Sequence, residues 1–245
     1  MEHSFSWQGK KVAFLGDSIT DKIHVGTTKN YWQFLAEYAG IEPLVYGLNG
    51  QAWRHAVPQA EKLYAEHGDN VDAIFVFLGT NDYNNAVPVG NFWSITEEKI
   101  NSHGVMMTKR CRTPILDEST FCGRINLGLK FLKERFPRQQ IVVLTPIHRG
   151  KFLGESPNIQ VPESCPNDID VYFEEYIAKI REAADIWSVP LIDLYRTSGL
   201  LPELEIFGQY VHDGSVDRLH PNAAGHERIA KTIFSQMLTL PPTFR

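Results

Sequence analysis

The sequence predicts an α/β fold, a three-layer α/β/α sandwich around a five-stranded parallel sheet with strand order 2-1-3-4-5. Two observations predict this fold. Five short runs rich in Val, Ile and Leu recur along the chain, as is typical of parallel strands covered on both faces. Between these runs lie stretches whose apolar residues recur at helical spacing. The 245 residues contain no internal repeat or linker, which indicates a single domain over residues 1–245.

Each element follows from a local pattern. Strands are expected where the apolar runs lie, at residues 11–15, 42–48, 73–79, 140–146 and 189–194. Helices are expected at residues 30–39, 53–68, 125–137 and 169–187, where the spacing of apolar residues is helical. A last helix is expected to begin with Pro221 at its first position and His220 as its cap, because proline is favoured there.

Three long segments fit neither pattern: residues 83–121, 148–167 and 195–219. Loops of this length in a compact domain are usually functional or disordered. They follow the third, fourth and fifth strands, so all three are expected to lie over the carboxyl edge of the sheet, where ligand sites of α/β proteins form.

Composition excludes several functions. A net charge of -5 gives no long-range attraction to nucleic acid, and the one basic cluster, Lys109 to Arg112, is expected to be a solvated face or loop. The three cysteines, Cys111, Cys122 and Cys165, lack CxxC spacing, which argues against a disulfide framework or a structural zinc site and predicts free thiols.

The sequence contains no apolar run near the ~20 residues that span a bilayer, and its N-terminal segment has no signal-peptide pattern. A cytoplasmic location is the direct expectation. A chain whose signal had been removed would look the same, so a periplasmic or secreted location stays open, as does the oligomeric state.

Residues that could take part in catalysis follow the first three predicted strands. Ser18 follows the first strand, the turn with Gly47, Asn49 and Gly50 follows the second, and Asn81 follows the third. In the flavodoxin-like strand order these three turns are neighbours, so a nucleophile and hydrogen-bond donors for an oxyanion would converge. The alternative for the first turn is that Gly16 makes the turn and Asp17 or Ser18 only caps the next helix.

A serine nucleophile needs a base, and His220 is the best candidate among the nine histidines. Asp217 precedes it by three residues and could hold the imidazole by its other nitrogen. A capping histidine with an incidental aspartate is the alternative for this segment alone.

Four short blocks occur in order along the chain: GDS, GLNGQ, GTND and DRLHPN. Together they resemble the SGNH hydrolase family, also called GDSL esterases and lipases. The resemblance implies that Ser18 is the nucleophile, that Asp217 and His220 complete a catalytic triad, and that the Ser18 N–H, the Gly50 N–H and the Asn81 amide bind the oxyanion. Gly47 is a near competitor of Gly50.

The resemblance further implies a serine esterase that works through an acyl-enzyme and needs no cofactor or metal. The favoured substrates are short acyl esters, mainly acetyl esters of a carbohydrate or polyol, because the long loops are polar and form no continuous apolar lid. A lipase, a thioesterase and an acyltransferase of the same fold remain alternatives. So do a glycan-binding module without activity and a receiver-like signalling domain, although Asp193 and Arg196 are a poor match to the latter.

Several other residues are candidates for the substrate site. Asp17 is expected mainly to hold the turn, but with Tyr83, His148 and Arg149 it could also line the substrate site. Four aromatic residues could form a wall of that site or fill the core: Trp53, Tyr83, Phe92 and Trp93. Neither GxGxxG nor GxxxxGK[ST] occurs, so nothing indicates a nucleotide-dependent enzyme.

Overall fold

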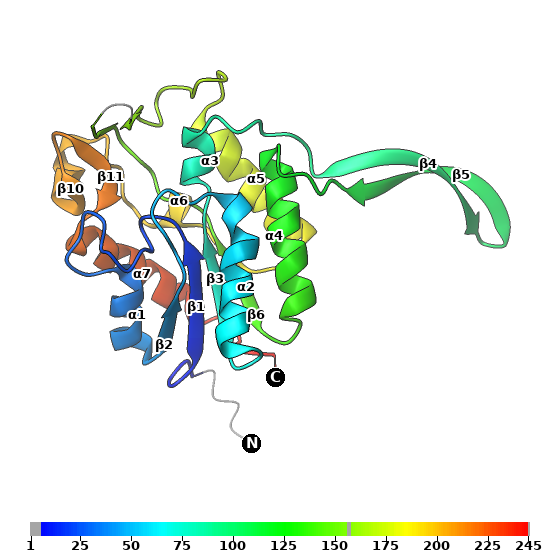
Figure 1. Cartoon of the computed structure of the whole chain (residues 1–245), viewed down its shortest axis with the longest axis horizontal. Helices are drawn as coiled ribbons and strands as arrows, with labels where there is room; N and C mark the ends of the chain where they lie inside the picture. Colours follow the sequence, from blue (N-terminus) through cyan, green and yellow to red (C-terminus); the bar gives the residue numbers. More distant parts are fainter. Residues whose placement is uncertain (1–5, 156–157, 245) are drawn as a thin grey trace.

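The structure is a computed structural model that describes residues 6–155 and 158–244. The first five residues of the N-terminal segment considered above therefore lie outside the described residues. Five parallel strands form the central sheet in the order β2-β1-β3-β6-β9, which confirms the predicted order (Figure 1). They are β1 (Lys11–Gly16), β2 (Glu42–Val45), β3 (Ala73–Phe77), β6 (Gln140–Leu144) and β9 (Leu191–Ile192).

Helices cover both faces of the sheet, which is why its central strands are buried along their length (Figure 1). One face carries α1 (Tyr31–Ala39) and α7 (Ala223–Met237), and the other carries α2 (Ala56–His67), α4 (Phe121–Arg135) and α5 (Phe173–Ile186). Successive side chains of β1 alternate between the two cores: Phe14 packs with the α1 and α7 side, and Leu15 with the α2 and α4 side.

A second, small sheet lies at the carboxyl edge of the first. Its order is β10-β11-β7-β8, from β10 (Val211–Asp213), β11 (Asp217–Pro221), β7 (Phe152–Leu153) and β8 (Ile159–Gln160). Short helical turns complete this edge: α3 (Thr80–Asn84), α6 (Leu194–Thr197), η1 (Trp53–His55) and η2 (Glu205–Tyr210). Two of the three segments expected as loops therefore contain short strands that join into one sheet.

The predicted start of the last helix is wrong. His220 and Pro221 are the last two residues of β11, and α7 begins at Ala223. Pairing with β10, in which Val211 lies opposite Pro221, keeps this segment extended. Asn222 is the cap instead, because its Oδ1 accepts a hydrogen bond of 3.1 Å from the Gly225 N–H.

The remaining segment, residues 83–121, also differs from its prediction as a loop over the carboxyl edge. It contains a hairpin of β4 (Trp93–Ser102) and β5 (Val105–Pro114), which extends sideways from the body (Figure 1). Most side chains of both strands are exposed, so the sequence shows neither a continuous apolar run nor a clear alternation. The basic cluster from Lys109 to Arg112 lies on this hairpin and is solvated, as predicted.

Two further expectations can be compared with the structure. The cysteines Cys111, Cys122 and Cys165 are all free. Among the described residues, none of the helices combines the length and the apolar character that crossing a membrane requires.

Candidate active site

Ser18 lies in a tightly fixed turn at the carboxyl end of β1. Gln59 of α2 makes two hydrogen bonds to the backbone of Gly16, accepting from its N–H at 2.9 Å and donating to its carbonyl at 2.8 Å. Asp17 Oδ1 then accepts from the Ile19 N–H at 3.1 Å. A Cβ at Gly16 would lie 2.2 Å from the Thr20 Oγ1, so only glycine fits where the chain turns. The turn therefore holds Ser18 in one position.

Ser18, His220 and Asp217 are hydrogen-bonded in a chain. Ser18 Oγ is 3.1 Å from His220 Nε2, and His220 Nδ1 is 2.9 Å from Asp217 Oδ2. All three residues are buried or nearly so. This is the geometry in which an imidazole can take a proton from a serine hydroxyl while a carboxylate orients the ring.

Asp217 is ionised in this arrangement. Burial alone would raise its pKa, but hydrogen bonds from the His220 ring and from the backbone N–H groups of His220 and Leu219 hold the pKa of Asp217 below its usual value. A carboxylate that stays charged can stabilise the imidazolium that forms when His220 accepts a proton.

Phe152 packs against this pair from the small sheet. It lies opposite Asp217 in the pairing of β7 with β11, and its ring meets the His220 ring edge-on at a centroid distance of 5.4 Å. The segment between β6 and α5 thus places an aromatic ring against the triad.

A cavity of about 440 Å³ opens beside Ser18 and His220, a size typical of small-molecule sites. Six of its lining residues carry amide side chains: Asn49, Asn81, Asn84, Asn85, Asn158 and Gln160. Its apolar side chains are Val25, Phe152, Leu153, Val216 and Leu219, and Gly26, Gly50 and His212 complete it with Asp217.

Only some of the residues that line the cavity could be predicted from the sequence. Asn84 and Asn85 follow the GTND block after one residue, so their nearness to Asn81 in the sequence was a usable signal. Asn158, Gln160 and His212 come from segments without periodicity, and tertiary pairing in the small sheet brings them to the cavity.

Gly50 and Asn81 lie at the cavity with Ser18, whereas Gly47 does not. The Asn81 amide donates to the Gln51 carbonyl at 2.8 Å, which uses one of its two N–H bonds and fixes its direction. Gly50 has a φ of +76°, in the left-handed region that glycine tolerates best. Gly47 is packed against Thr20, whose Cβ would be 2.5 Å from an added Cβ.

Asp17 is beside the triad but does not line the cavity. It is 3% exposed, and this burial raises its pKa to about 7. The hydrogen bond from Ile19 and the nearby His220 act in the opposite direction, and they are outweighed. The structure thus places Asp17 in the turn, where it accepts from Ile19, and not among the residues that line this cavity.

The other three residues predicted to line the substrate site are also absent from the cavity wall. Tyr83 is buried, and its hydroxyl donates to the Cys165 carbonyl at 2.7 Å. His148 is hydrogen-bonded to Glu163 at 2.5 Å, and its ring lies against Tyr195. Arg149 is buried because the chain folds back over it, and it donates to Gln160 Oε1 at 3.0 Å. Arg149 thus contacts Gln160, which lines the cavity, without lining the cavity itself.

The aromatic residues considered for a wall of the site belong to the core or to the hairpin. Trp53 and Phe92 are buried, and the Trp53 Nε1 donates to the Leu78 carbonyl at 3.1 Å. Trp93 is partly buried at the start of β4, where the Arg112 guanidinium lies 5.1 Å from its ring centroid. Phe152, which was not predicted, is the aromatic residue that faces the triad.

Comparison with solved structures shows that the fold is shared widely. A protein of Lactobacillus plantarum is 27% identical, with a TM-score of 0.73 and coverage of 95% of this chain and 98% of that one. A possible lipase from Chitinophaga pinensis is 19% identical, with a TM-score of 0.66 over 93% and 98%. The acetyl xylan esterase AlAXEase is 19% identical, with a TM-score of 0.53 over 92% and 98%.

A comparison with curated proteins found no match. The model of the GDSL-like lipase/acylhydrolase family matches residues 14–228, a range that contains all four sequence blocks and the Ser18, His220 and Asp217 cluster. Membership implies esterase or acylhydrolase chemistry. Because the match spans most of the sequence, this chain belongs to the GDSL-like lipase/acylhydrolase family.

Proposed function

We propose that this protein is a serine ester hydrolase that acts on short acyl esters, above all acetyl esters, of a carbohydrate or another polyol. The observation that carries the proposal is the hydrogen-bonded chain from Ser18 through His220 to Asp217 at the wall of a cavity. A serine in this arrangement becomes a nucleophile, because the proton that it loses has an acceptor in place.

The reaction follows from these contacts. Ser18 Oγ attacks the ester carbonyl carbon while its proton passes to His220 Nε2. The tetrahedral intermediate collapses when the imidazolium gives that proton to the alcohol oxygen, the C–O bond breaks, and the acyl group stays on Ser18. Water then attacks the acyl carbon while His220 Nε2 takes one of its protons. The bond between the acyl carbon and Ser18 Oγ breaks as the imidazolium returns that proton to Oγ, and the carboxylic acid leaves. The proton transfers and the covalent steps are carried by Ser18, His220 and water.

The negative charge of the intermediate requires donors. The Ser18 N–H, the Gly50 N–H and the free N–H of the Asn81 amide are the groups proposed to bind the oxyanion, because Gly50 and Asn81 line the same cavity as Ser18. Each such donor typically contributes about 3 kcal/mol to the transition state.

The lining of the cavity supports the substrate class. Residues with amide side chains make up six of those that line the cavity, and amides both donate to and accept from hydroxyl groups. A polyol can form hydrogen bonds with the amide groups that are not already paired, whereas a long acyl chain cannot, and a buried polar group left without a partner costs about 1–3 kcal/mol. Asn81, Asn158 and Gln160 each have one or more hydrogen bonds within the protein. The structural neighbour AlAXEase, an acetyl xylan esterase, has the same fold and agrees with this choice.

A panel of aryl esters from acetyl to long-chain acyl tests the proposal on the wild-type protein and on Ser18→Ala. We expect the highest kcat/KM for acetyl and a steep fall with chain length, and loss of activity in the variant. A preference for long chains would contradict the substrate class. Activity that survives in Ser18→Ala would contradict the mechanism.

The same panel separates the remaining functions of this fold. Faster release of the aryl alcohol on adding a polyol, with an acylated polyol as product, would indicate an acyltransferase. The salicylyl-acyltransferase SsfX3 shares the fold, at 17% identity and a TM-score of 0.61, over 97% of this chain and 57% of that one. A glycan-binding module would bind a polyol without hydrolysing any ester.

A further inference from the structure

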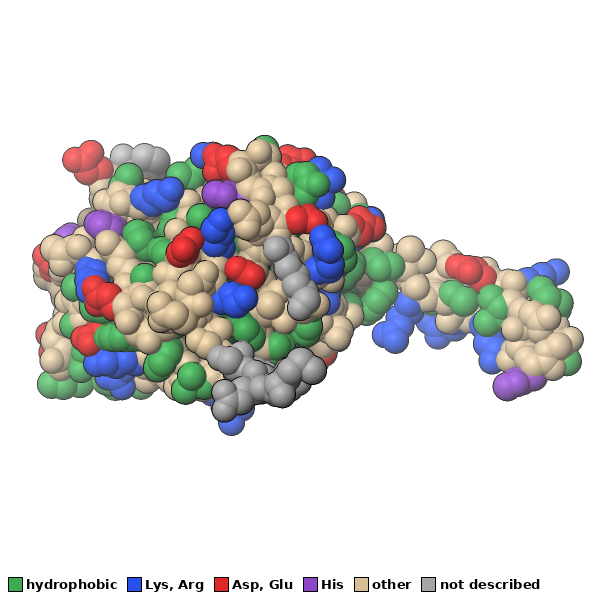
Figure 2. Space-filling model, turned by 90° about the horizontal axis from the view of Figure 1, so that it is seen from below, with side chains coloured by type: hydrophobic (Ala, Val, Ile, Leu, Met, Phe, Trp, Pro, Cys, Tyr) green, Lys and Arg blue, Asp and Glu red, His purple; other side chains and the backbone are tan. Residues whose placement is uncertain are grey.

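The β4–β5 hairpin, called the arm below, is the feature of this chain that the active site does not explain. Its two antiparallel strands have ten residues each, a length of roughly 33 Å, and it stands clear of the body (Figures 1 and 2). In the part of the chain that the structure describes, the two strands pair only with each other, which leaves both outer edges open.

The direction of the arm is fixed at its root. The Ile115 N–H donates to the Phe92 carbonyl at 2.9 Å, which closes the two strands. Asn126 of α4, which is buried, donates through its amide nitrogen to both the Phe92 and the Ile115 carbonyls at 2.9 Å each. Trp187 holds the other end of this amide, donating to Asn126 Oδ1 at 2.9 Å. A buried network thus anchors an exposed arm.

Several large apolar side chains of the arm are exposed to solvent. Val105, Met106 and Met107 are 61%, 62% and 46% exposed near its tip, and Ile100 lies opposite Met107. An isolated two-stranded hairpin is marginally stable in water, and long open edges favour pairing with another chain. Exposed apolar surface of this kind typically marks an interaction site.

The two faces of the arm differ in charge. Residues opposite each other in the pairing share a face, and so do alternate residues of one strand. Met106 therefore shares a face with Ile95, Glu97, Lys99, Arg110 and Arg112, and we call it the basic face because three of these residues are basic and one is acidic. Met107 is on the other face with Val105 and Ile100, and there Lys109 and Glu98 are opposite each other, so that face has no net charge from Lys, Arg, Asp or Glu. Lys and Arg side chains are visible along the arm in Figure 2.

Charge indicates which partner fits the basic face. The arm holds four basic and two acidic residues, a net charge of +2. The whole chain carries -5, so the remaining residues carry -7. Two arms repel each other, and a chain with this body repels nucleic acid, whereas an arm and the body of a second copy attract.

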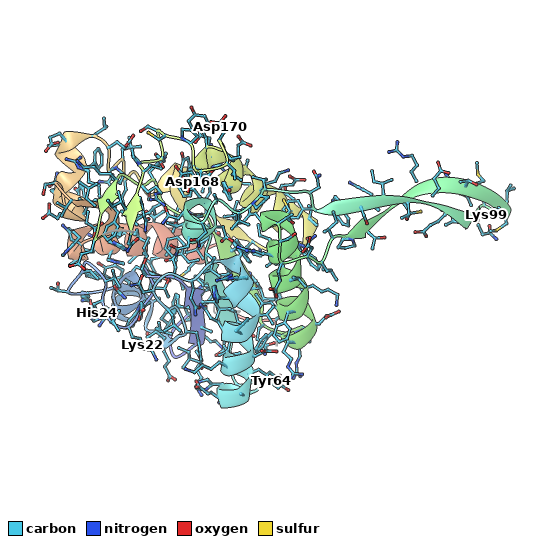
Figure 3. The ribbon with its side chains drawn as sticks, turned by 45° about the horizontal axis from the view of Figure 1, so that its top comes forward. Lys22, His24, Tyr64, Lys99, Asp168 and Asp170 are labelled. Carbon is cyan, nitrogen blue, oxygen red and sulfur yellow. The ribbon has the colours of Figure 1, made fainter. Side chains whose placement is uncertain are left out.

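The body offers a surface that complements the basic face. Residues 168–175, called the acidic strip, contain four acidic residues and no basic one. Its exposed residues are Asp168, Ile169, Asp170, Tyr172, Glu174 and Glu175. It therefore combines apolar and charged side chains as the basic face does, with opposite sign. Figure 3 shows Asp168 and Asp170 on the body and Lys99 near the far end of the arm, out of reach within one copy.

We propose that the arm is a dimerisation element whose basic face docks on the acidic strip of a second copy of this chain. Two-fold symmetry makes the contact reciprocal, so that each copy gives one arm and receives one. The pairing buries Met106 against apolar residues of the strip, and it places Lys99 and Arg110 near carboxylates.

Sedimentation velocity of the full chain tests the proposal with a matched pair of variants. We expect a dimer for the wild-type protein and at least a tenfold rise of its dissociation constant in Met106→Asp. Met107→Asp, on the other face of the same hairpin, is expected to change the constant by less than threefold. A monomeric wild-type protein, whether or not it binds nucleic acid, overturns the proposal. So does a Met107→Asp variant that dissociates as readily as Met106→Asp.

A charge exchange tests the docking surface. Lys99→Glu with Arg110→Glu, and separately Asp168→Lys with Glu174→Lys, should each weaken the dimer at least tenfold. All four changes in one chain should restore it, because the opposite charges then meet again. Thermal melts and ester hydrolysis, compared with the wild-type protein, verify that every variant is folded. Folded variants without rescue overturn the assignment of the acidic strip.

Discussion

Ser18 Oγ lies 3.1 Å from His220 Nε2, although 202 residues separate the two in the chain. The contact exists because both residues lie at the same edge of the molecule. Ser18 follows β1 in the centre of the main sheet, and His220 is in β11 of the small sheet above its carboxyl edge. The pair therefore depends on the packing of the two sheets, and its chemistry is testable at each residue.

Ser18 should react covalently with serine-directed reagents. A sulfonyl fluoride or an organophosphonate is expected to add once, because His220 Nε2 is in place to accept the proton of the Ser18 hydroxyl. Peptide mapping by mass spectrometry identifies the modified residue. Ser18→Ala should remain unlabelled, with kcat lower by roughly four orders of magnitude or more. Labelling at another residue would refute the choice of nucleophile.

His220 and Asp217 should contribute unequally. His220→Ala is expected to lower kcat about as much as Ser18→Ala, whereas Asp217→Asn should lower it less, because the imidazole can still accept a proton but is held less well. Measured kcat values for both variants, with His67→Ala as a control far from the site, test this. His226→Ala is not a suitable control, since His226 is buried and stacks on Tyr31. Equal losses in His67→Ala and His220→Ala would contradict the assignment.

The sheet and the reacting residues could be predicted from the sequence for physical reasons. Strands such as β1 and β3 are buried on both faces, so they are continuous apolar runs that stand out in the sequence. Ser18 and Asn81 directly follow these strands, where the order of the sheet brings their turns together.

Other features depend on tertiary contacts that leave no local pattern. Gln160 reaches the cavity only because β7 pairs with β11 and β8 with β7. Arg149 was expected near the substrate. The pairing of these strands instead leaves it buried, where it is hydrogen-bonded to Gln160. The arm escaped prediction because strands exposed on both faces have no apolar periodicity.

The two glycines of the second block should respond differently to alanine. An added Cβ at Gly50 would have no heavy atom within 4 Å, but its φ of +76° strains any L residue and would turn the N–H away. Gly50→Ala is expected to lower kcat for an acetyl ester by roughly one to three orders of magnitude, with a small loss of stability. At Gly47 an added Cβ would collide with Thr20, so Gly47→Ala should act mainly through stability, by roughly 1–3 kcal/mol.

Measurements of kcat and a thermal melt for both variants separate the two effects. If Gly47→Ala loses kcat with an unchanged melt, the donor is the earlier glycine.

His226 should make the protein less stable in acid. Its Nδ1 accepts a hydrogen bond of 3.2 Å from the Tyr31 N–H, and burial lowers its pKa to about 3. In the unfolded chain this histidine binds a proton below about pH 6.5, whereas in the folded chain it stays neutral down to about pH 3. The free energy of unfolding therefore falls as pH decreases from about 6.5 toward 3. His226→Gln keeps an acceptor without this titration. Its deficit relative to the wild-type protein should shrink on acidification in urea titrations at several pH values. A deficit that is constant with pH would refute the assignment.

Asp17 should have the opposite effect in the same range. Burial raises its pKa to about 7 from the model-peptide value of about 3.8, so between these pH values the folded chain holds a proton that the unfolded chain has lost. The contribution of Asp17 to stability is therefore present in acid and is lost as pH rises through that window, with a slope no steeper than about 1.4 kcal/mol per pH unit. Asp17→Asn keeps the oxygen that accepts from Ile19 and removes the charge. Relative to the wild-type protein, this variant should gain stability from about pH 4 to about pH 7, which urea unfolding at a series of pH values measures. A difference that stays flat over that range would mean that the folded protein holds Asp17 as a carboxylate throughout, with the charge balanced by His220 nearby.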